Sequence, residues 1–181
     1  MRTPSQVASL ATVELRNGIT VNLRAIRPDD APRLQAFFTQ LSSQSAFFRF
    51  LTSWKELARE KAEYLACVDY KTRMAVVATI ETGGQDQVIA LASYAQLPSP
   101  DARMAEAAVV VQDQYQGLGL GTILLQNLAA LARMNDISTF VGLVHAENTR
   151  MLLWLRNSGL DFVYRKTAEG ASDIQVEVEI P

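Results

Sequence analysis

Three glycines stand two positions apart in the stretch QYQGLGLGT, shortly after a run of three valines. Gly117, Gly119 and Gly121 precede a segment in which leucines recur at helical spacing. A glycine inside a helix costs about 1 kcal/mol relative to alanine, so these residues need another explanation. Glycine leaves main-chain amides uncovered, and the amides and positive dipole end of a helix N-terminus attract anions. The pattern predicts a phosphate-binding turn, with close packing of helix on strand as the structural alternative.

Two known nucleotide-binding loops fit this turn poorly. A P-loop has four residues between its glycines and a lysine before Ser or Thr, whereas three residues separate Gly117 from Gly121 and Thr122 follows without a lysine. A Rossmann turn has the spacing G-x-G-x-x-G and an acidic residue about 20 positions later. Here the third glycine comes one residue early and Asp136 comes too soon. A nucleotide-binding oxidoreductase stays an alternative on this motif.

The segments around the turn predict an α/β fold (α+β mixed sheet) in which most strands are antiparallel. Alternating apolar residues indicate a hairpin over 12–26, where Asn17-Gly18 suits a type I′ turn, and a second hairpin whose strands, 73–81 and 87–97, meet at Gly83-Gly84. End signals and helical spacing indicate helices after Asp29 or Asp30, over 53–68, over 119–134 and over 148–159, and a short helix or turn at SSQSAFFRF. In the helix over 53–68, Ser53 is the expected cap and Tyr64 lies on the buried side. Further strands are expected over 103–112 and 139–146, at DFVYRKT and at DIQVEVEI. Residues 1–11 are expected to be a flexible tail and residues 12–181 one domain.

Composition narrows the function. The 181 residues carry 17 Lys and Arg against 19 Asp and Glu, a net charge of −2, which argues against a nucleic-acid binder that works by charge neutralisation. No stretch approaches the roughly 20 apolar residues of a membrane span, so we expect a cytoplasmic protein without a membrane partner. The single cysteine, Cys67, is expected in the core, and with the single histidine, His145, it cannot form a structural zinc site. No metal is therefore expected.

The segment Gln116-x-x-Gly119-x-Gly121 resembles the [QR]-x-x-G-x-[GA] pyrophosphate loop of the GNAT superfamily of acyl-CoA-dependent N-acyltransferases. AEAAVVVQDQYQGLGLG is similar to the acid-bearing strand and loop of that family, and HAENTRMLLWLRNSGLDF to its later EN…M…GF segment. The N-terminal LRAIRPDDAPRLQAFFTQLSSQSAFFRF resembles the branch that contains bacterial protein-lysine acetyltransferases, including the Arg49-Phe50 pair. The likeness runs in collinear order over residues 20 to 165, and it implies a central mixed sheet that splays at an acyl-CoA site.

The resemblance implies a donor site made largely of main chain. Amides of residues 117 to 122 would bind the pyrophosphate of coenzyme A, and the backbone of residues 109–111 would pair with pantetheine. Amides near Val109 or Val111 would also stabilise the oxyanion. The cofactor-binding residues implied in this way are Val109, Val110, Val111, Gln116, Gly117, Leu118, Gly119, Leu120, Gly121, Thr122 and Asn148, the last of which also caps its own helix.

The resemblance also implies the catalytic group. Acyl transfer to an alkylammonium with a pKa near ~10.4 requires a base, and Glu106 matches the acid on the strand before the loop. From the residues alone, Glu106 is equally an outward-facing strand residue. Many family members place a tyrosine near the leaving thiolate, but Leu155 stands at that position here. Tyr115 lies just before the loop and is expected to be a packing residue.

These inferences predict transfer of an acetyl group from acetyl-CoA to a primary amine, which is a protein lysine or a small amine. Glu106 would act as general base in direct attack. The partners would be acyl-CoA and the amine acceptor, without nucleic acid, and a homodimer is possible. The alternative of another class is a non-catalytic acyl-CoA-binding regulatory module.

Overall fold

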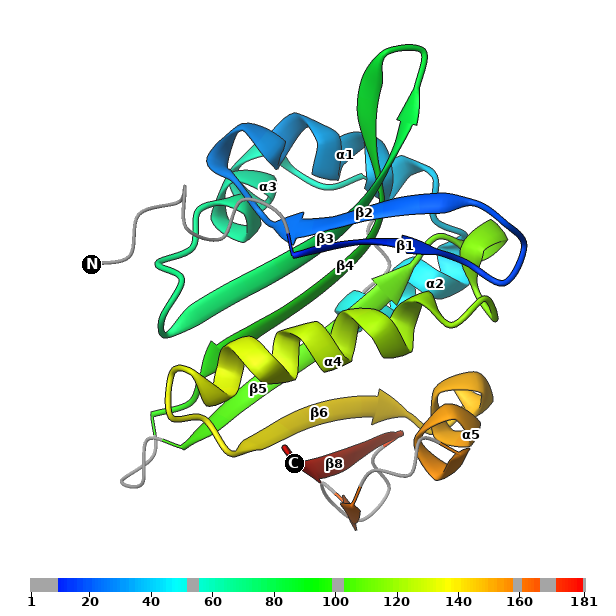
Figure 1. Cartoon of the computed structure of the whole chain (residues 1–181). Coiled ribbons are helices and arrows are strands. Elements are labelled where there is room, and N and C mark those ends of the chain that lie inside the picture. Colours follow the sequence, from blue (N-terminus) through cyan, green and yellow to red (C-terminus); the bar gives the residue numbers. More distant parts are fainter. Residues whose placement is uncertain (1–9, 52–55, 99–102, 158–160, 167–171, 181) are drawn as a thin grey trace.

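The computed structural model describes residues 10–51, 56–98, 103–157, 161–166 and 172–180. These residues form an eight-stranded sheet with the order β1-β2-β3-β4-β5-β6-β8-β7 (Figure 1). Neighbouring strands are antiparallel except for the pair β5 and β6. This confirms the predicted mixed, mostly antiparallel sheet. The strands are β1 (Ala11–Glu14), β2 (Thr20–Ala25), β3 (Arg73–Thr82), β4 (Gln85–Gln96), β5 (Met104–Val111), β6 (Thr139–His145), β7 (Phe162–Lys166) and β8 (Asp173–Glu179).

Helices cover both faces of the sheet because the side chains of its central strands alternate between two cores. On β3, Val76 and Ala78 pack with Leu124 and Leu128 of α4, whereas Val77 on the opposite face packs with the first three helices. Figure 1 shows α4 in front of β5 and α5 beside the end of β6. The helices are α1 (Ala31–Thr39), α2 (Ser43–Phe50), α3 (Arg59–Ala66), α4 (Leu120–Arg133) and α5 (Thr149–Asn157), with short 3₁₀ turns η2 (Pro28–Asp30) and η3 (Asp113–Tyr115).

The two predicted hairpins form, but they use different turns. Gly83 and Gly84 have φ of 60° and 76° and connect Thr82 directly to its partner Gln85, as expected of a two-residue turn. At the first hairpin only Gly18 has a positive φ, 81°, so the predicted type I′ turn is wrong. The Gly18 amide donates to the Leu15 carbonyl at 2.9 Å, and Asn17 keeps a negative φ. Three residues therefore close this hairpin, with glycine supplying the left-handed position.

Local details differ from the expectations at several places. The helix predicted to follow Asp29 or Asp30 begins at Ala31, but the Asp30 carboxylate does not cap it, because it accepts hydrogen bonds from Arg24 at 2.6 and 2.7 Å and from the Arg27 amide at 2.9 Å. Cys67 is exposed, since α3 ends at Ala66 and the chain turns away there. Tyr64 is also exposed, and its ring lies under the Arg73 guanidinium at 3.8 Å instead of in the core. The helix predicted over 53–68 is shorter, because residues 56–58 are not helical and α3 begins at Arg59. Ser53, Gly159 and residues 1–9 of the predicted tail lie outside the described residues.

Candidate active site

The sheet opens between β5 and β6. The parallel ladder joins residues 104–106 of β5 to 139–141 of β6 and ends at the pair Glu106 and Val141. Beyond this pair β5 continues to Val111, still paired with β4, and β6 continues to His145. Because Gln112 donates to Ile89 of β4, alternate residues of β5 bond to β4 and the residues between them face β6. The edge of β5 that faces β6 therefore carries main-chain groups of Ala107, Val109 and Val111 that no strand of the described chain pairs. An extended ligand can pair there as an additional strand.

The glycine turn follows directly and is held open by its backbone conformation. Gly117 and Gly119 have φ of 77° and 91°, backbone angles that residues with a side chain rarely adopt. Gly119 is the N-cap residue of α4. A Cβ at either position would meet no atom within 4 Å, and a Cβ at Gly121 would meet only Val111 at 3.8 Å. Close packing of helix on strand therefore does not explain these glycines. The turn leaves space in front of the free amides at the start of α4, as an anion site requires.

Gln116 holds this turn to three neighbouring elements. Its amide nitrogen donates to the Val111 carbonyl at 2.8 Å and to the Ser45 hydroxyl at 3.1 Å. Its amide oxygen accepts a hydrogen bond from Arg150 of α5. Gln116 thus connects the end of β5, the start of α2 and α5, and it brings a cation beside the glycine turn.

Asp113 of η3 anchors the N-terminal end of α2. Its carboxylate accepts hydrogen bonds from the Ser42 amide at 2.9 Å, the Ser42 hydroxyl at 2.7 Å and the Ser45 hydroxyl at 2.8 Å. Burial raises the pKa of Asp113, but these hydrogen bonds outweigh it and the pKa lies below its ordinary value. Ser45 therefore bridges Asp113 and Gln116, so that α2 is tied to the segment that forms the turn.

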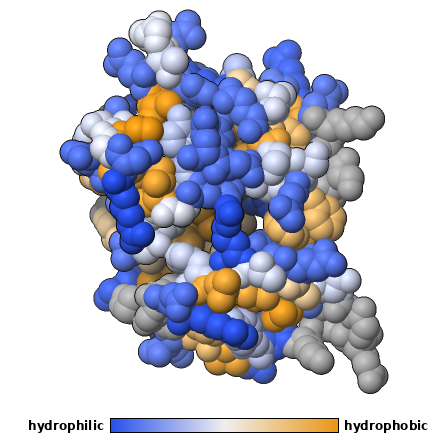
Figure 2. All heavy atoms as spheres, turned by 90° about the vertical axis from the view of Figure 1, so that its right-hand side faces the viewer, coloured by the Kyte–Doolittle hydropathy of each residue, from blue (hydrophilic) through white to orange (hydrophobic). Residues whose placement is uncertain are grey.

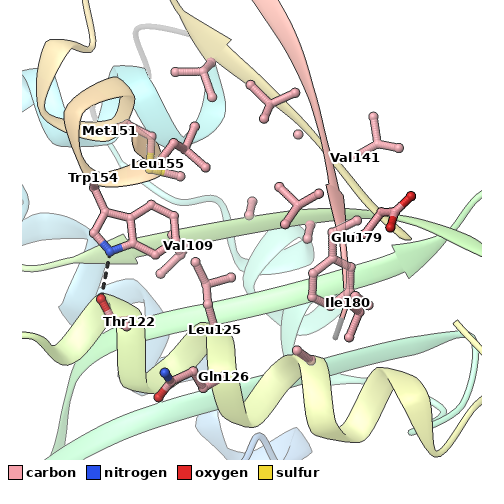
Figure 3. Close-up of a pocket in the computed structure, with 18 of the residues that line it drawn as sticks. Val109, Thr122, Leu125, Gln126, Val141, Met151, Trp154, Leu155, Glu179 and Ile180 are labelled. Atoms are coloured by element: carbon pink, nitrogen blue, oxygen red, sulfur yellow. Dashed lines mark hydrogen bonds between the residues drawn. The ribbon is translucent and has the colours of Figure 1, made fainter. Parts of the chain in front are cut away.

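An apolar cavity of about 250 Å³ lies on the α4 and α5 side of the opening (Figure 3). The Trp154 indole nitrogen donates to the Thr122 hydroxyl at 2.7 Å and joins α5 to the first turn of α4 at the cavity edge. Figure 2 shows the side of the molecule on which α5 lies, where apolar side chains gather in the lower half beneath a more hydrophilic upper half. The lining residues include Val109, Thr122, Leu125, Met151, Trp154 and Leu155.

Glu106 lies at the apex of the opening, on the opposite face of the sheet. It is exposed, and it shares a face with Ser93, because it pairs with Ala95 and side chains two residues apart project to the same side. Helix α2 lies over this face: Arg49 donates to the Ser93 hydroxyl at 3.2 Å. The carboxylate of Glu106 is thus accessible beside α2, close to where the free edge of β5 begins.

Aromatic rings of α2 reach the end of β6 across the opening. The His145 ring lies 5.3 Å from the ring of Phe47 and 5.9 Å from that of Phe48, measured between centroids. The His145 Nδ1 atom accepts a hydrogen bond from the Glu147 amide at 3.3 Å. These three half-buried rings form one wall of the opening on the Glu106 side.

The structure brings most residues of the predicted donor site together, in different ways. Val109 and Thr122 line the cavity, whereas Val110, Leu120 and Tyr115 are buried. Leu120 can therefore offer only its main chain, and the main chain of Val110 is paired with Leu91 of β4. The Asn148 side chain accepts from the Met151 amide at 3.2 Å, which confirms its capping role. Leu118 is half-buried against the core.

Four residues that sequence reasoning gave no role contact this site: Ser45, Arg49, Asp113 and Arg150. Each of them contacts a residue that is distant in the sequence, so local patterns do not reveal it. Only the Arg49-Phe50 pair was noticed in the sequence, as part of the family resemblance. Among the described residues no cluster of three or more His, Cys, Asp and Glu side chains could hold a metal ion. None of the helices built from those residues combines the length and apolar character needed to cross a membrane.

Comparison with known proteins now identifies the family. The model of the Acetyltransferase (GNAT) family matches residues 36–159. Acetyltransferase PA5475 of Pseudomonas aeruginosa is 32% identical over 137 residues, which cover 76% of this chain and 73% of the relative. The chain therefore belongs to the GNAT family, and it is an N-acetyltransferase.

Further relatives narrow the branch of the family to which the chain is similar. The crystal structure of the GNAT domain of S. lividans PAT superposes with a TM-score of 0.83 at 31% identity, over 93% of this chain and 96% of that domain. Acetyltransferase Pat of Mycolicibacterium smegmatis is 31% identical over 93% of this chain, but this chain spans only 48% of Pat. A cAMP-binding acyltransferase from Mycobacterium smegmatis matches with a TM-score of 0.64 and 27% identity, over 98% of this chain and 48% of that protein. These matches support the protein acetyltransferase branch.

Proposed function

We propose that this protein transfers an acetyl group from acetyl-CoA to a primary amine and that the preferred acceptor is a protein lysine. The proposal rests on two adjacent main-chain surfaces, the unpaired edge of β5 and the glycine turn that follows it. Coenzyme A has an amide-containing arm that suits the strand edge and a diphosphate that suits the turn. Similarity to the PAT and Pat proteins supports the lysine acceptor.

The donor would lie along these surfaces. Free amides of Gly117, Leu118, Gly119, Leu120, Gly121 and Thr122 would bind the diphosphate, assisted by the dipole of α4. The main chain at Val109 and Val111 would pair with pantetheine, whereas the main chain of Val110 between them bonds to β4. The Arg150 guanidinium, which contacts Gln116, would add charge beside the diphosphate. Asn148, at the start of α5, would lie close to the same arm.

The chemistry needs one proton acceptor and one charge stabiliser. The amine nitrogen attacks the thioester carbonyl, a C–N bond forms, and the C–S bond breaks with release of the thiolate. Glu106 would take the ammonium proton, directly or through a water molecule. A main-chain amide near Val109 or Val111 would stabilise the oxyanion, a contribution of about 3 kcal/mol. Leu155 is 3% exposed and has no proton to give, so water is the proposed donor to the thiolate.

The alternative function is tested on the same sample, with acetyl-CoA binding measured beside turnover. The purified protein is incubated with acetyl-CoA and either lysine-containing peptides or a panel of small primary amines, and free thiol is measured over time. We expect thiol release that depends on the amine. A protein that binds acetyl-CoA but acetylates no amine would be a binding module.

A further inference from the structure

Arg49 of α2 is held over the sheet by two contacts. Its Nη2 atom donates to the Ser93 hydroxyl at 3.2 Å, and its guanidinium carbon lies 4.8 Å from the centroid of the neighbouring Phe50 ring. Phe50 in turn packs against Phe38 of α1, with ring centroids 5.5 Å apart. The guanidinium therefore has a fixed position on the face of β4 and β5 that also carries Glu106.

The strand register places Arg49 next to Glu106. Ser93 pairs with Ala108 and Ala95 pairs with Glu106, so Ser93 and Glu106 are diagonal neighbours on one face. Such neighbours lie about 7–8 Å apart across a strand pair, within reach of a long side chain. The positive charge of Arg49 is thus tethered one diagonal step from the proposed base.

Arg49 is half-buried, and its guanidinium lies over the sheet without the carboxylate partner that such a charge usually has. No carboxylate of the described residues forms an ion pair with it, and its Nε atom is buried without a hydrogen-bond partner. Burial lowers the pKa of Arg49 to about 10, and the charge of Glu106 acts in the opposite direction. A charge kept at this cost without a partner suggests a role in function.

We propose that Arg49 is a positioning residue whose fixed charge orients the Glu106 carboxylate and favours the neutral form of the bound acceptor amine. A fixed cation attracts the carboxylate toward the place where the amine must lie, and it destabilises an ammonium there relative to the neutral amine. The inference rests on the proposed function, because it takes Glu106 as the base.

Other titratable side chains face the region around Glu106, and none of them is substituted in the variants tested below. Glu177 of β8 pairs with Val141, the partner of Glu106 on β6, and its carboxylate accepts from Arg165 of β7 at 2.9 Å. His145 lies further along β6 on this face. A change that follows substitution of Arg49 alone is therefore due to Arg49.

The test is the pH profile of kcat for the whole chain at saturating acetyl-CoA and lysine peptide. Wild type is compared with Arg49→Gln, Arg49→Lys and Arg59→Gln, the last a charge change at an arginine whose side chain is 80% exposed on α3. We expect Arg49→Gln to move the acidic limb upward by about one pH unit and to lower kcat at pH 7 about tenfold. Arg49→Lys and Arg59→Gln should stay within about 0.3 unit of wild type.

Two results would overturn the inference. Either Arg49→Gln leaves the acidic limb in place, or Arg49→Lys moves it as far as Arg49→Gln does, which would mean that shape and not charge matters. If Arg49→Gln does not fold, Ser93→Ala replaces it: loss of the tether should move the limb upward by a smaller amount, and an unmoved limb contradicts the proposal. Thermal unfolding of each variant reports whether it is folded.

Glu106→Gln separates this inference from the proposed function. If Glu106→Gln turns over as wild type does, the proposed base is wrong and the Arg49 inference falls with it. If Glu106→Gln is inactive while the Arg49→Gln profile is unmoved, the base stands and only the role of Arg49 is wrong.

Discussion

At the scale of single residues, Glu106 carries the proposed proton transfer. Glutamine has nearly the same shape but cannot accept the proton, so Glu106→Gln should lower kcat by about 10²–10⁴. The affinity for acetyl-CoA should stay unchanged, because the donor surfaces lie elsewhere. Steady-state kinetics and calorimetry on the same sample measure both quantities. Turnover within threefold of wild type would remove Glu106 from this role.

Gly117 allows a second prediction, for which the chain offers a matched control. Gly117 and Gly84 have φ of 77° and 76°, and a Cβ at either would meet no atom within 4 Å. Alanine at either position should therefore cost about 1–2 kcal/mol of stability. Gly117→Ala should also weaken coenzyme A binding about tenfold, because its Cβ enters the space in front of the diphosphate-binding amides.

Gly84→Ala should leave that affinity unchanged. Urea unfolding gives the stability of both variants, and calorimetry gives their affinities. Equal affinities for coenzyme A would show that Gly117 serves only the backbone conformation of the turn.

At the scale of elements, the central relation is between α2 and the glycine turn. Asp113, Ser42, Ser45 and Gln116 tie the helix that faces Glu106 to the segment that would bind the donor. Asp113→Ala removes three hydrogen bonds to α2, so it should lower stability by about 1–3 kcal/mol. It should also raise the acceptor KM more than the donor KM, since α2 and not the turn loses its anchor.

The control is Asp29→Ala, which removes the same charge from a side chain that is 71% exposed. Its two KM values should match those of wild type. Equal rises of the donor and acceptor KM in Asp113→Ala would contradict the assignment of α2 to the acceptor side.

Most elements could be predicted from the sequence because their signals are local. Alternation along 73–81 and the glycine pair after it predict β3 and its turn, and the capping Asn148 predicts the start of α5. The predicted type I′ turn at Asn17-Gly18 was wrong because the register of the hairpin, and not the dipeptide, decides the turn type. The apolar neighbours Leu65, Ala66 and Val68 predict that Cys67 lies in the core, but α3 ends at Ala66 and Cys67 is exposed.

The site could be predicted only as far as its local motif reaches. The glycine turn is contiguous in sequence, and so is its strand. Its supporting contacts are not: Ser42 and Asp113 are 71 residues apart, and Arg49 and Ser93 are 44 apart. No spacing rule links such pairs, because only the strand order and the docking of α2 bring them together.

At the scale of the whole molecule, one buried ion pair makes stability depend on pH. Side chains of Arg24 and Asp30 are 8% and 1% exposed, and their closest atoms are 2.6 Å apart. Burial raises the pKa of Asp30, but hydrogen bonds from Arg24 and the Arg27 amide outweigh it and the pKa is lowered. The stabilisation is therefore complete above the ordinary aspartate pKa of about 3.9 and is lost as pH falls below it.

Asp30→Asn should accordingly cost about 3–5 kcal/mol near pH 7, because it leaves the Arg24 charge buried without its partner. The difference from wild type should shrink as pH falls from 5 toward 3 (roughly the range set by the ordinary and lowered pKa). Urea unfolding across this range measures it, with Asp29→Asn as an exposed control. A difference that stays constant with pH would contradict the assignment of the effect to the Asp30 charge.

The most direct test of the whole account is calorimetric titration of the protein with coenzyme A and, separately, with pantetheine. If main-chain amides of the glycine turn bind the diphosphate, coenzyme A should bind with a dissociation constant between about 1 µM and 1 mM, in the range of enzyme substrates. Pantetheine, which has no diphosphate, should bind at least about tenfold more weakly. Equal affinities for the two ligands, or no binding of coenzyme A by the folded protein, would contradict the account.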